Sequence, residues 1–301
     1  MSDYYGRPII KEPVWTPEIP IYFFTGGLAG ASAGLAFMAE RTGNEVLARR
    51  AWIAALGGVA VSPALLISDL GVPTRFLNML RMFKVTSPMS VGSWILSVSG
   101  VSTGLAAVNS LTGLFPVLGK ASKPVAALFG LPLSTYTGAL IANTSVPIWH
   151  NGRRTLPALF AAGAAASAGA AATVMTPVRH AAPARRLAII GAASELVATN
   201  VMEEHLGGVA QPYHEGSSGT LTRVAKVLTA VGGMTIGAWG HRRRSAAVIG
   251  GGALLAGALT ERFAVFRAGF ESAKDPKFTV GPQRERIEAG RGRGASQRAA
   301  A

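Results

Sequence analysis

The sequence contains Ile19-Pro-Ile-Tyr-Phe-Phe-Thr-Gly-Gly-Leu-Ala-Gly-Ala-Ser-Ala-Gly-Leu-Ala-Phe-Met-Ala39, a run of 21 residues without a charged side chain. At about 1.5 Å per residue, an α-helix of this length crosses a hydrocarbon core of roughly 30 Å. Gly26, Gly30 and Gly34 recur every four residues and share one helix face, so a second helix can approach that face closely. The run therefore predicts a membrane-spanning helix with a packing seam.

The composition of the whole chain agrees with a membrane protein. Of 301 residues, 49% are hydrophobic and 15% are charged, against roughly 25% charged in a soluble domain. The net charge of +14 would suggest nucleic acid binding in a soluble protein. Here the basic residues lie in short loops and in the C-terminal tail, where contact with lipid headgroups explains them. Nucleic-acid binding is therefore disfavoured.

The pattern predicts seven further spanning helices, and thus an all-α integral membrane protein with eight transmembrane helices and both termini on one side. Lys and Arg are numerous in the loops on both sides, so the positive-inside rule leaves the side open. A polar lead-in covers 1–18, and a basic tail at 271–301 is expected to be disordered. The further helices are expected at 51–70, 91–113, 124–149, 155–175, 184–202, 221–240 and 246–266.

The residue types restrict the metals that the chain can hold. It has no cysteine, which excludes a cysteine-ligated iron–sulfur cluster and covalently attached haem. All five histidines fall at predicted helix ends or in loops, so no facing pair is available for a b-type haem. We expect no metal site, and any redox metal must then belong to a partner.

The loop between the second and third predicted helices carries a candidate site. Asp69 lies at a helix exit, Arg75 follows shortly after, and a helix restarts after Pro88. The alternative interpretation is that Asp69 caps backbone groups while Arg75, with the other loop bases, meets lipid headgroups.

Polar residues at the ends of the first four predicted helices would converge near one membrane face if these helices form a bundle. A quinone headgroup needs such a place, because it requires hydrogen-bond partners, apolar walls and a carboxylate for protons. Alternatively, Tyr136 bonds a helix carbonyl and Glu18 caps a helix. The candidate quinone-binding residues are Tyr136, Glu18, Tyr22, Asp69, Arg75 and Asn78.

The second half of the chain carries charges at mid-membrane depth. Glu195 lies near the middle of a predicted span, and Glu261 is adjacent to Arg262 in the last one. An unpaired carboxylate there is costly, so it is expected to be protonated, paired or beside water. These three residues form either a proton pathway or a structural pair; we favour the structural role for Glu261 and Arg262, and Glu195 is the sharper proton candidate.

Four segments together resemble the NrfD-like membrane subunits of polysulfide reductase-type complexes. The first half of the chain carries the resemblance, whereas the second half matches in helix number alone. The segments are Trp15–Gly34, Asp69-Leu-Gly-Val-Pro-Thr-Arg75, Ser87-Pro-Met-Ser90 with Gly92 and Trp94, and Tyr136-Thr-Gly138 followed by Pro147 and Trp149.

The resemblance implies two four-helix bundles, here 19–149 and 150–270, with no haem and with a quinone, expected to be menaquinone, contacted by Tyr136. It also implies that a four-cluster ferredoxin-like iron–sulfur subunit docks near the quinone site, with a molybdopterin-type catalytic subunit beyond it. The protein would then lie in the bacterial plasma membrane.

These observations lead to one main hypothesis and two rivals. The main hypothesis is a quinone-reactive membrane anchor of a respiratory oxidoreductase complex. In it, Glu18 and Asp69 pass protons, and Arg75 either keeps Asp69 ionised or steers the docked subunit. One rival is a proton-coupled secondary transporter with helix breaks at Pro63 and Pro132, although no inverted repeat is visible in the sequence. The other is a purely structural anchor, for which a buried polar cluster would be wasteful.

Overall fold

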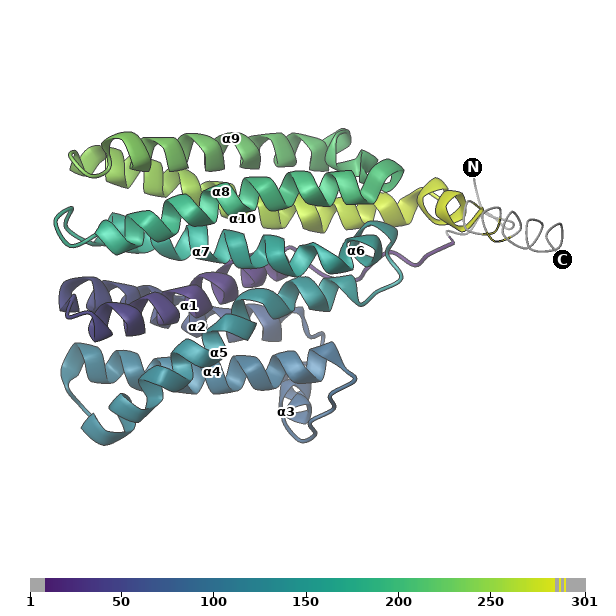
Figure 1. The fold of residues 1–301 in the computed structure, drawn as a ribbon. Helices are drawn as coiled ribbons and strands as arrows, with labels where there is room; N and C mark the ends of the chain where they lie inside the picture. Colours follow the sequence, from purple (N-terminus) through teal and green to yellow (C-terminus); the bar gives the residue numbers. More distant parts are fainter. Residues whose placement is uncertain (1–8, 285–286, 288–289, 291–301) are drawn as a thin grey trace, which may run out of the picture.

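The computed structural model describes residues 9–284, 287 and 290, and these residues form helices and loops without a β-strand. Eight helices have 20 residues or more and lie roughly side by side (Figure 1). Short helical turns connect them: η1 (Pro73–Arg75), α3 (Phe76–Met79), α6 (Pro147–Asn151), η2 (Gly152–Arg154) and η3 (Gly207–Tyr213). The long helices are α1 (Glu18–Arg41), α2 (Glu45–Asp69), α4 (Pro88–Thr112), α5 (Pro116–Ala142), α7 (Leu156–Met175), α8 (Ala182–Leu206), α9 (Gly216–Trp239) and α10 (Arg244–Lys274).

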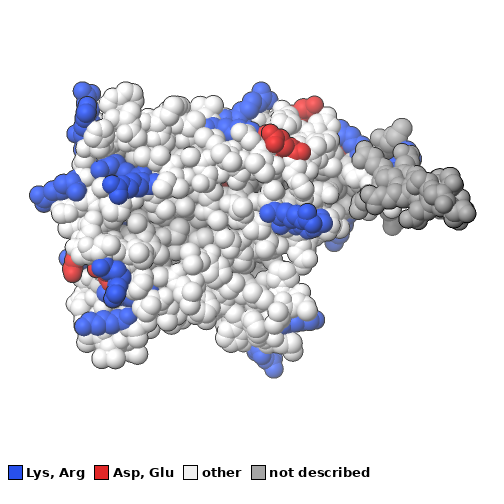
Figure 2. Space-filling model, in the orientation of Figure 1, with Lys and Arg blue, Asp and Glu red and all other residues white. Residues whose placement is uncertain are grey.

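Six of the long helices are both long and apolar enough to cross a membrane: α1, α2, α4, α5, α7 and α10. This confirms an all-helical, multi-pass membrane protein. The helices α8 and α9 have the length but not the apolar composition. The five charged residues Arg185, Arg186, Glu195, Glu203 and Glu204 all lie in α8. Their crossing of the membrane stays a prediction. On the face shown in Figure 2, Lys and Arg gather towards the two ends of the molecule, and a band without charges lies between them.

The long helices pack as two rings of four. In the first ring, α1 contacts α2, α2 contacts α4, α4 contacts α5 and α5 returns to α1. In the second ring, α7, α8, α9 and α10 contact one another in the same cyclic order. The rings meet where α7 packs against α1 and α5, so one continuous core joins the two halves (Figure 1).

Glycines allow the closest helix contacts. A Cβ atom built on Gly30 of α1 would lie 2.3 Å from the carbonyl oxygen of Gly130 in α5. The reverse contact, from Gly130 to the Gly30 oxygen, would be 2.4 Å. The predicted packing seam of α1 is therefore real at Gly30, whereas a Cβ on Gly34 would meet nothing within 4 Å.

The fourth predicted helix, 124–149, has different bounds in the structure. The helix α5 begins earlier, at Pro116, and Pro124 lies inside it. It ends at Ala142, and Trp149 belongs to the separate helix α6. There the Trp149 indole Nε1–H donates a hydrogen bond to the Val265 carbonyl of α10 (2.8 Å) and the ring stacks on Trp15 (5.6 Å between centroids).

The predicted disordered tail, 271–301, is wrong in its first part. Residues 271–274 belong to α10, and 277–284 are helical as well. Phe278 is only 7% exposed because it packs into the hydrophobic core. The remainder of the predicted tail lies outside the described residues except for residues 287 and 290. Of the predicted lead-in, residues 1–8 also lie outside, and 9–17 run to the start of α1 without a long helix.

Candidate functional site

A pocket lies in the first helix ring, at the end of the molecule where α1 begins and α10 ends; its space, including open solvent at its mouth, is about 530 Å³. The start of α1, the end of α2, the start of α4 and the end of α5 form it, together with the lead-in and α3. Most of the lining is apolar. The lining residues are Trp15, Ile19, Tyr22, Phe23, Leu66, Asp69, Leu70, Met79, Met89, Gly92, Ser93, Tyr136 and Leu140.

Two tyrosines line this pocket from different helices. Tyr22 of α1 is 1% exposed, and its buried hydroxyl has no hydrogen-bond partner among the described residues. Tyr136 of α5 is half-buried, and its ring rests on Gly92 of α4, where a Cβ atom would lie 2.3 Å from the Tyr136 Cε2. A buried hydroxyl without a partner is costly, so Tyr22 has an unused hydrogen-bonding group at the pocket.

Asp69 closes α2 at the edge of the same pocket. Its Oδ1 accepts hydrogen bonds from the Thr16 backbone N–H (2.9 Å) and from the Thr16 hydroxyl (2.7 Å). Both bonds end on one oxygen, which leaves Oδ2 available. Asp69 thus ties the lead-in to α2, as the capping alternative proposed, and it also lines the pocket.

Three of the predicted quinone-binding residues lie outside the pocket lining. Arg75 and Asn78 are exposed, because η1 and α3 carry them to the surface and turn Met79 towards the pocket instead. None of the ion pairs of the described residues joins Arg75 to Asp69, so the structure does not contain the pairing, and the alternative role of Arg75, steering a docked subunit, stays a prediction. Glu18 begins α1 and is half-buried beside the site.

The second helix ring contains a buried charge cluster. Glu195 of α8 is 2% exposed, and Glu261 and Arg262 of α10 are 6% and 2% exposed. Arg262 forms an ion pair with Glu261, donates from Nη2 to the Phe160 carbonyl (3.0 Å), and lies 3.9 Å from the centre of the Phe160 ring. The predicted pairing of Glu261 with Arg262 is therefore present.

Glu195 differs from that pair because neither of its carboxylate oxygens has a hydrogen-bond partner among the described residues. The side chains of Glu195 and Arg262 both pack against Gly163 of α7. A Cβ atom built on Gly163 would lie 2.7 Å from Glu195 Oε1 and 2.7 Å from Arg262 Nη2. Beside these groups lies a small pocket lined by Glu195, Glu261 and Tyr213 among others; its space, including open solvent, is about 340 Å³.

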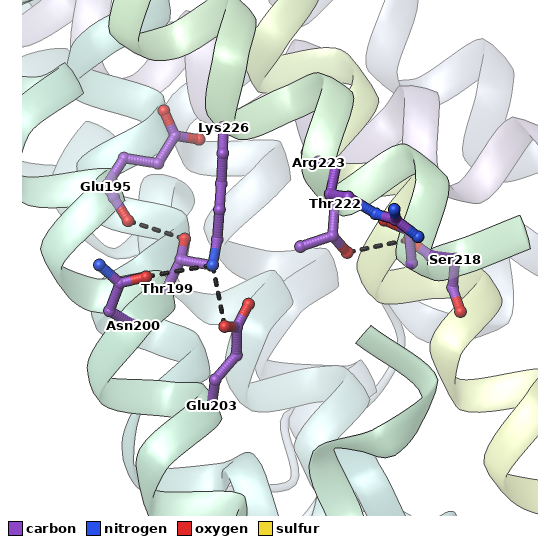
Figure 3. A network of polar contacts seen from close by, with 9 residues as sticks. Glu195, Thr199, Asn200, Glu203, Ser218, Thr222, Arg223 and Lys226 are labelled. Atoms are coloured by element: carbon purple, nitrogen blue, oxygen red, sulfur yellow. Dashed lines mark hydrogen bonds and ion pairs between the residues drawn. The ribbon is translucent and has the colours of Figure 1, made fainter. Parts of the chain in front are cut away.

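Two further residues of this pocket, Tyr213 and Lys226, were not among the site residues predicted from the sequence. Tyr213 of η3 is 2% exposed, and its hydroxyl has no partner among the described residues. Lys226 of α9 forms an ion pair with Glu203 (2.8 Å) and donates to Asn200 Oδ1 (3.1 Å), as Figure 3 shows. Lys226 is separated from Glu203 by 23 positions in the chain, so only the folded structure reveals the pair.

No group of three His, Asp or Glu side chains suited to a metal ion occurs within 9–284 or at 287 and 290.

Comparison with known families places the chain. The family model described as polysulphide reductase, NrfD, matches residues 10–272. The match therefore covers both helix rings. It includes the second half of the chain, in which no sequence motif resembled the family. Neither curated proteins nor solved structures show a match. The chain therefore belongs to the NrfD (polysulphide reductase) family.

Proposed function

We propose that this chain is the quinone-binding membrane subunit of a polysulfide reductase-type complex, and that the pocket of Tyr22, Asp69 and Tyr136 holds the quinone headgroup. The Tyr22 hydroxyl carries the proposal: it is buried and has no hydrogen-bond partner within the described part of the chain, and a ligand oxygen in the pocket would satisfy it. The proposal includes passage of all eight long helices through the membrane.

The residues present fit a quinone. Its ring and tail need apolar walls, which Trp15, Phe23 and Met89 supply with the other apolar lining residues. Its carbonyl oxygens need hydrogen-bond donors, and Tyr22 and Tyr136 offer two hydroxyls from different helices. Asp69 adds a carboxylate at the rim.

Each polar residue then has a definite task. When bound, a quinone supplies chemistry in which electron transfer is accompanied by proton exchange at its oxygens. Tyr22 and Tyr136 orient the headgroup by donating hydrogen bonds. Asp69 exchanges protons with the surface through its available Oδ2, while Thr16 keeps the carboxylate in place through Oδ1. Glu18, half-buried beside the site, is the second candidate for proton exchange at this end of the molecule.

We further propose that electrons reach this pocket from an iron–sulfur subunit docked at the same end of the molecule, with a molybdopterin-type subunit beyond it. The chain has no cysteine for a cluster of its own. The pocket lies at the end where α1 begins, and exposed bases such as Arg75, Arg153 and Arg154 surround that end. Menaquinone in a bacterial plasma membrane is the expected context.

The test uses Tyr22→Phe and Tyr136→Phe in the intact complex purified from native membranes. Each change removes one hydroxyl without removing the ring, so quinone turnover should fall by roughly tenfold for a lost hydrogen bond of about 1.4 kcal/mol. Tyr213→Phe, a buried tyrosine in the other helix ring, is the matched control. Unchanged turnover in both pocket variants would contradict the proposed site.

A second proposed role, proton transfer through the second helix ring, rests on Glu195. Neither oxygen of its buried carboxylate has a hydrogen-bond partner among the described residues, and it borders a pocket, whereas Glu261 forms an ion pair with Arg262 through one of its oxygens. In proteoliposomes, Glu195→Gln should abolish proton translocation and spare quinone turnover. Loss of folding alone would favour a structural role. Proton-coupled solute uptake without any quinone turnover would instead favour the transporter alternative.

A further inference from the structure

We propose that a second pocket, at the opposite end of the first helix ring from the quinone site, binds the phosphate headgroup of an anionic phospholipid. The pocket has about 1100 Å³ of empty space, including its open mouth. It lies between the end of α1, the start of α2, the end of α4 and the start of α5. Its lining residues are Phe37, Glu40, Arg41, Glu45, Ala48, Arg49, Asn109, Ser110, Lys120 and Lys123.

The floor of this pocket is built around Glu40. Its Oε2 forms an ion pair with Lys123 (2.9 Å), and its Oε1 accepts hydrogen bonds from the Trp52 indole N–H (2.9 Å) and the Ser110 hydroxyl (3.3 Å). Trp52 is fully buried. Side chains of α2, α4 and α5 thus contact one carboxylate of α1, and the charge of that carboxylate is paired within the protein.

The remaining charges leave the pocket positive. With Glu40 and Lys123 paired, Arg41, Arg49 and Lys120 face a single further acid, Glu45. Arg49 donates one hydrogen bond from Nη2 to the Leu111 carbonyl (2.9 Å), which orients its guanidinium group. Arg41 and Lys120 are exposed, and none of the ion pairs found among the described residues includes either of them. Free cationic donors of this kind match a phosphate group.

Apolar side chains beside the pocket distinguish a lipid from a soluble anion. The corner between α4 and α5 exposes Leu114 (57%), Phe115 (57%), Val117 (81%) and Leu118 (57%). The Asn109 side chain, which lines the pocket, holds this corner by donating to the Leu114 carbonyl (3.0 Å). Acyl chains would cover these side chains while the headgroup meets the cations, as expected at the membrane interface.

The position of the pocket supports the same occupant. It lies at the ends of α1, α2, α4 and α5, four helices that are long and apolar enough to cross a membrane, and its lining includes four basic residues. It shares no lining residue with the quinone pocket. The lipid proposal therefore stands or falls independently of the proposed quinone chemistry.

The experiment measures thermal unfolding of the delipidated full-length protein in mild detergent. Three additives are compared: phosphatidylglycerol, phosphatidylcholine and inorganic phosphate. The variant is the double substitution Arg41→Gln with Lys120→Gln; both side chains are exposed, so folding should be preserved. Arg50→Gln removes an exposed charge next to Arg49 that does not line the pocket, and serves as the matched control.

We expect phosphatidylglycerol alone to raise the unfolding temperature of the wild-type protein and of Arg50→Gln, and this shift to fall by more than half in the double variant. Native mass spectrometry should show the matching loss of one retained lipid. An equal shift in the double variant would overturn the site. An equal effect of phosphatidylcholine would overturn the role of headgroup charge, and a full effect of inorganic phosphate would replace the lipid by a free anion.

Discussion

At the scale of single residues, the proposed quinone pocket depends on a glycine that makes no polar contact. Gly92 supports the ring of Tyr136, and a Cβ atom there would lie 2.3 Å from Cε2 and 2.9 Å from Cδ2 of that ring. Because these atoms belong to a side chain that can turn, a larger residue would displace the tyrosine rather than the helix.

Gly92→Ala should therefore lower quinone affinity, by up to roughly tenfold if the Tyr136 hydrogen bond is lost, with little loss of stability. Quinone titration of the purified complex measures the change. Gly100→Ala is the control, since a Cβ at that position of α4 would meet nothing within 4 Å. Equal affinities in the two variants would show that Tyr136 does not need its present orientation.

Some of the residues predicted for this site line the pocket and others do not, and the difference has a physical reason. Tyr22, Asp69 and Tyr136 lie on or at the end of long helices, whose spacing and ends indicate the membrane face that a side chain reaches. Arg75 and Asn78 lie on short turns, where local sequence does not determine the direction of a side chain. Trp15 and Met79, which line the pocket, are apolar residues with no chemical signal of their own.

At the scale of helices, the contact of Gly30 with Gly130 holds α1 against α5. Each glycine lies close to the backbone oxygen of the other, and a backbone atom cannot turn away as a side chain can. The same device appears in the second ring, where a Cβ on Gly232 of α9 would lie 2.8 Å from the Gly250 oxygen of α10.

Gly30→Ala should destabilise the protein by roughly 1–3 kcal/mol or more, the usual cost of overpacking. Gly34→Ala, one turn further along the same helix, meets open space and should be neutral or stabilising by up to about 1 kcal/mol through helix propensity. Thermal unfolding in detergent would separate the two variants. A neutral Gly30→Ala would mean that α1 and α5 can move apart at little cost.

At the scale of the whole molecule, α10 connects the two candidate sites. It carries Glu261 and Arg262, and eight positions after Glu261 lies Gly269, where a Cβ atom would come 2.1 Å from the Trp149 ring. Trp149 stacks on Trp15, which lines the proposed quinone pocket in the first ring. The Trp15 wall of the proposed quinone pocket is thus supported, through Trp149, by the same helix that carries Glu261 and Arg262 of the second ring.

The number of membrane crossings is also a property of the whole molecule. If all eight long helices cross the membrane, the loop after α8 lies on the same side as the loop after α2. If α8 and α9 lie outside the membrane, the loop after α8 lies instead on the same side as the loop after α9. The chain lacks cysteine, so single cysteines report cleanly. In intact cells or sealed vesicles, Gly208→Cys should react with a membrane-impermeant maleimide like Gly71→Cys and unlike Arg242→Cys. If Gly208→Cys is instead labelled to the same extent as Arg242→Cys, the protein crosses the membrane six times.

Local composition was sufficient to establish a helical membrane protein, because charge-free runs such as 19–39 have one low-energy structure in a bilayer. Helical spacing also indicated the Gly30 seam and the face to which Tyr22, Asp69 and Tyr136 belong. Only the tertiary structure decided that Gly30 meets Gly130, that Asp69 bonds Thr16 instead of Arg75, and that Lys226 pairs with Glu203. Each of those contacts joins distant parts of the chain, and its partner is selected by packing between helices.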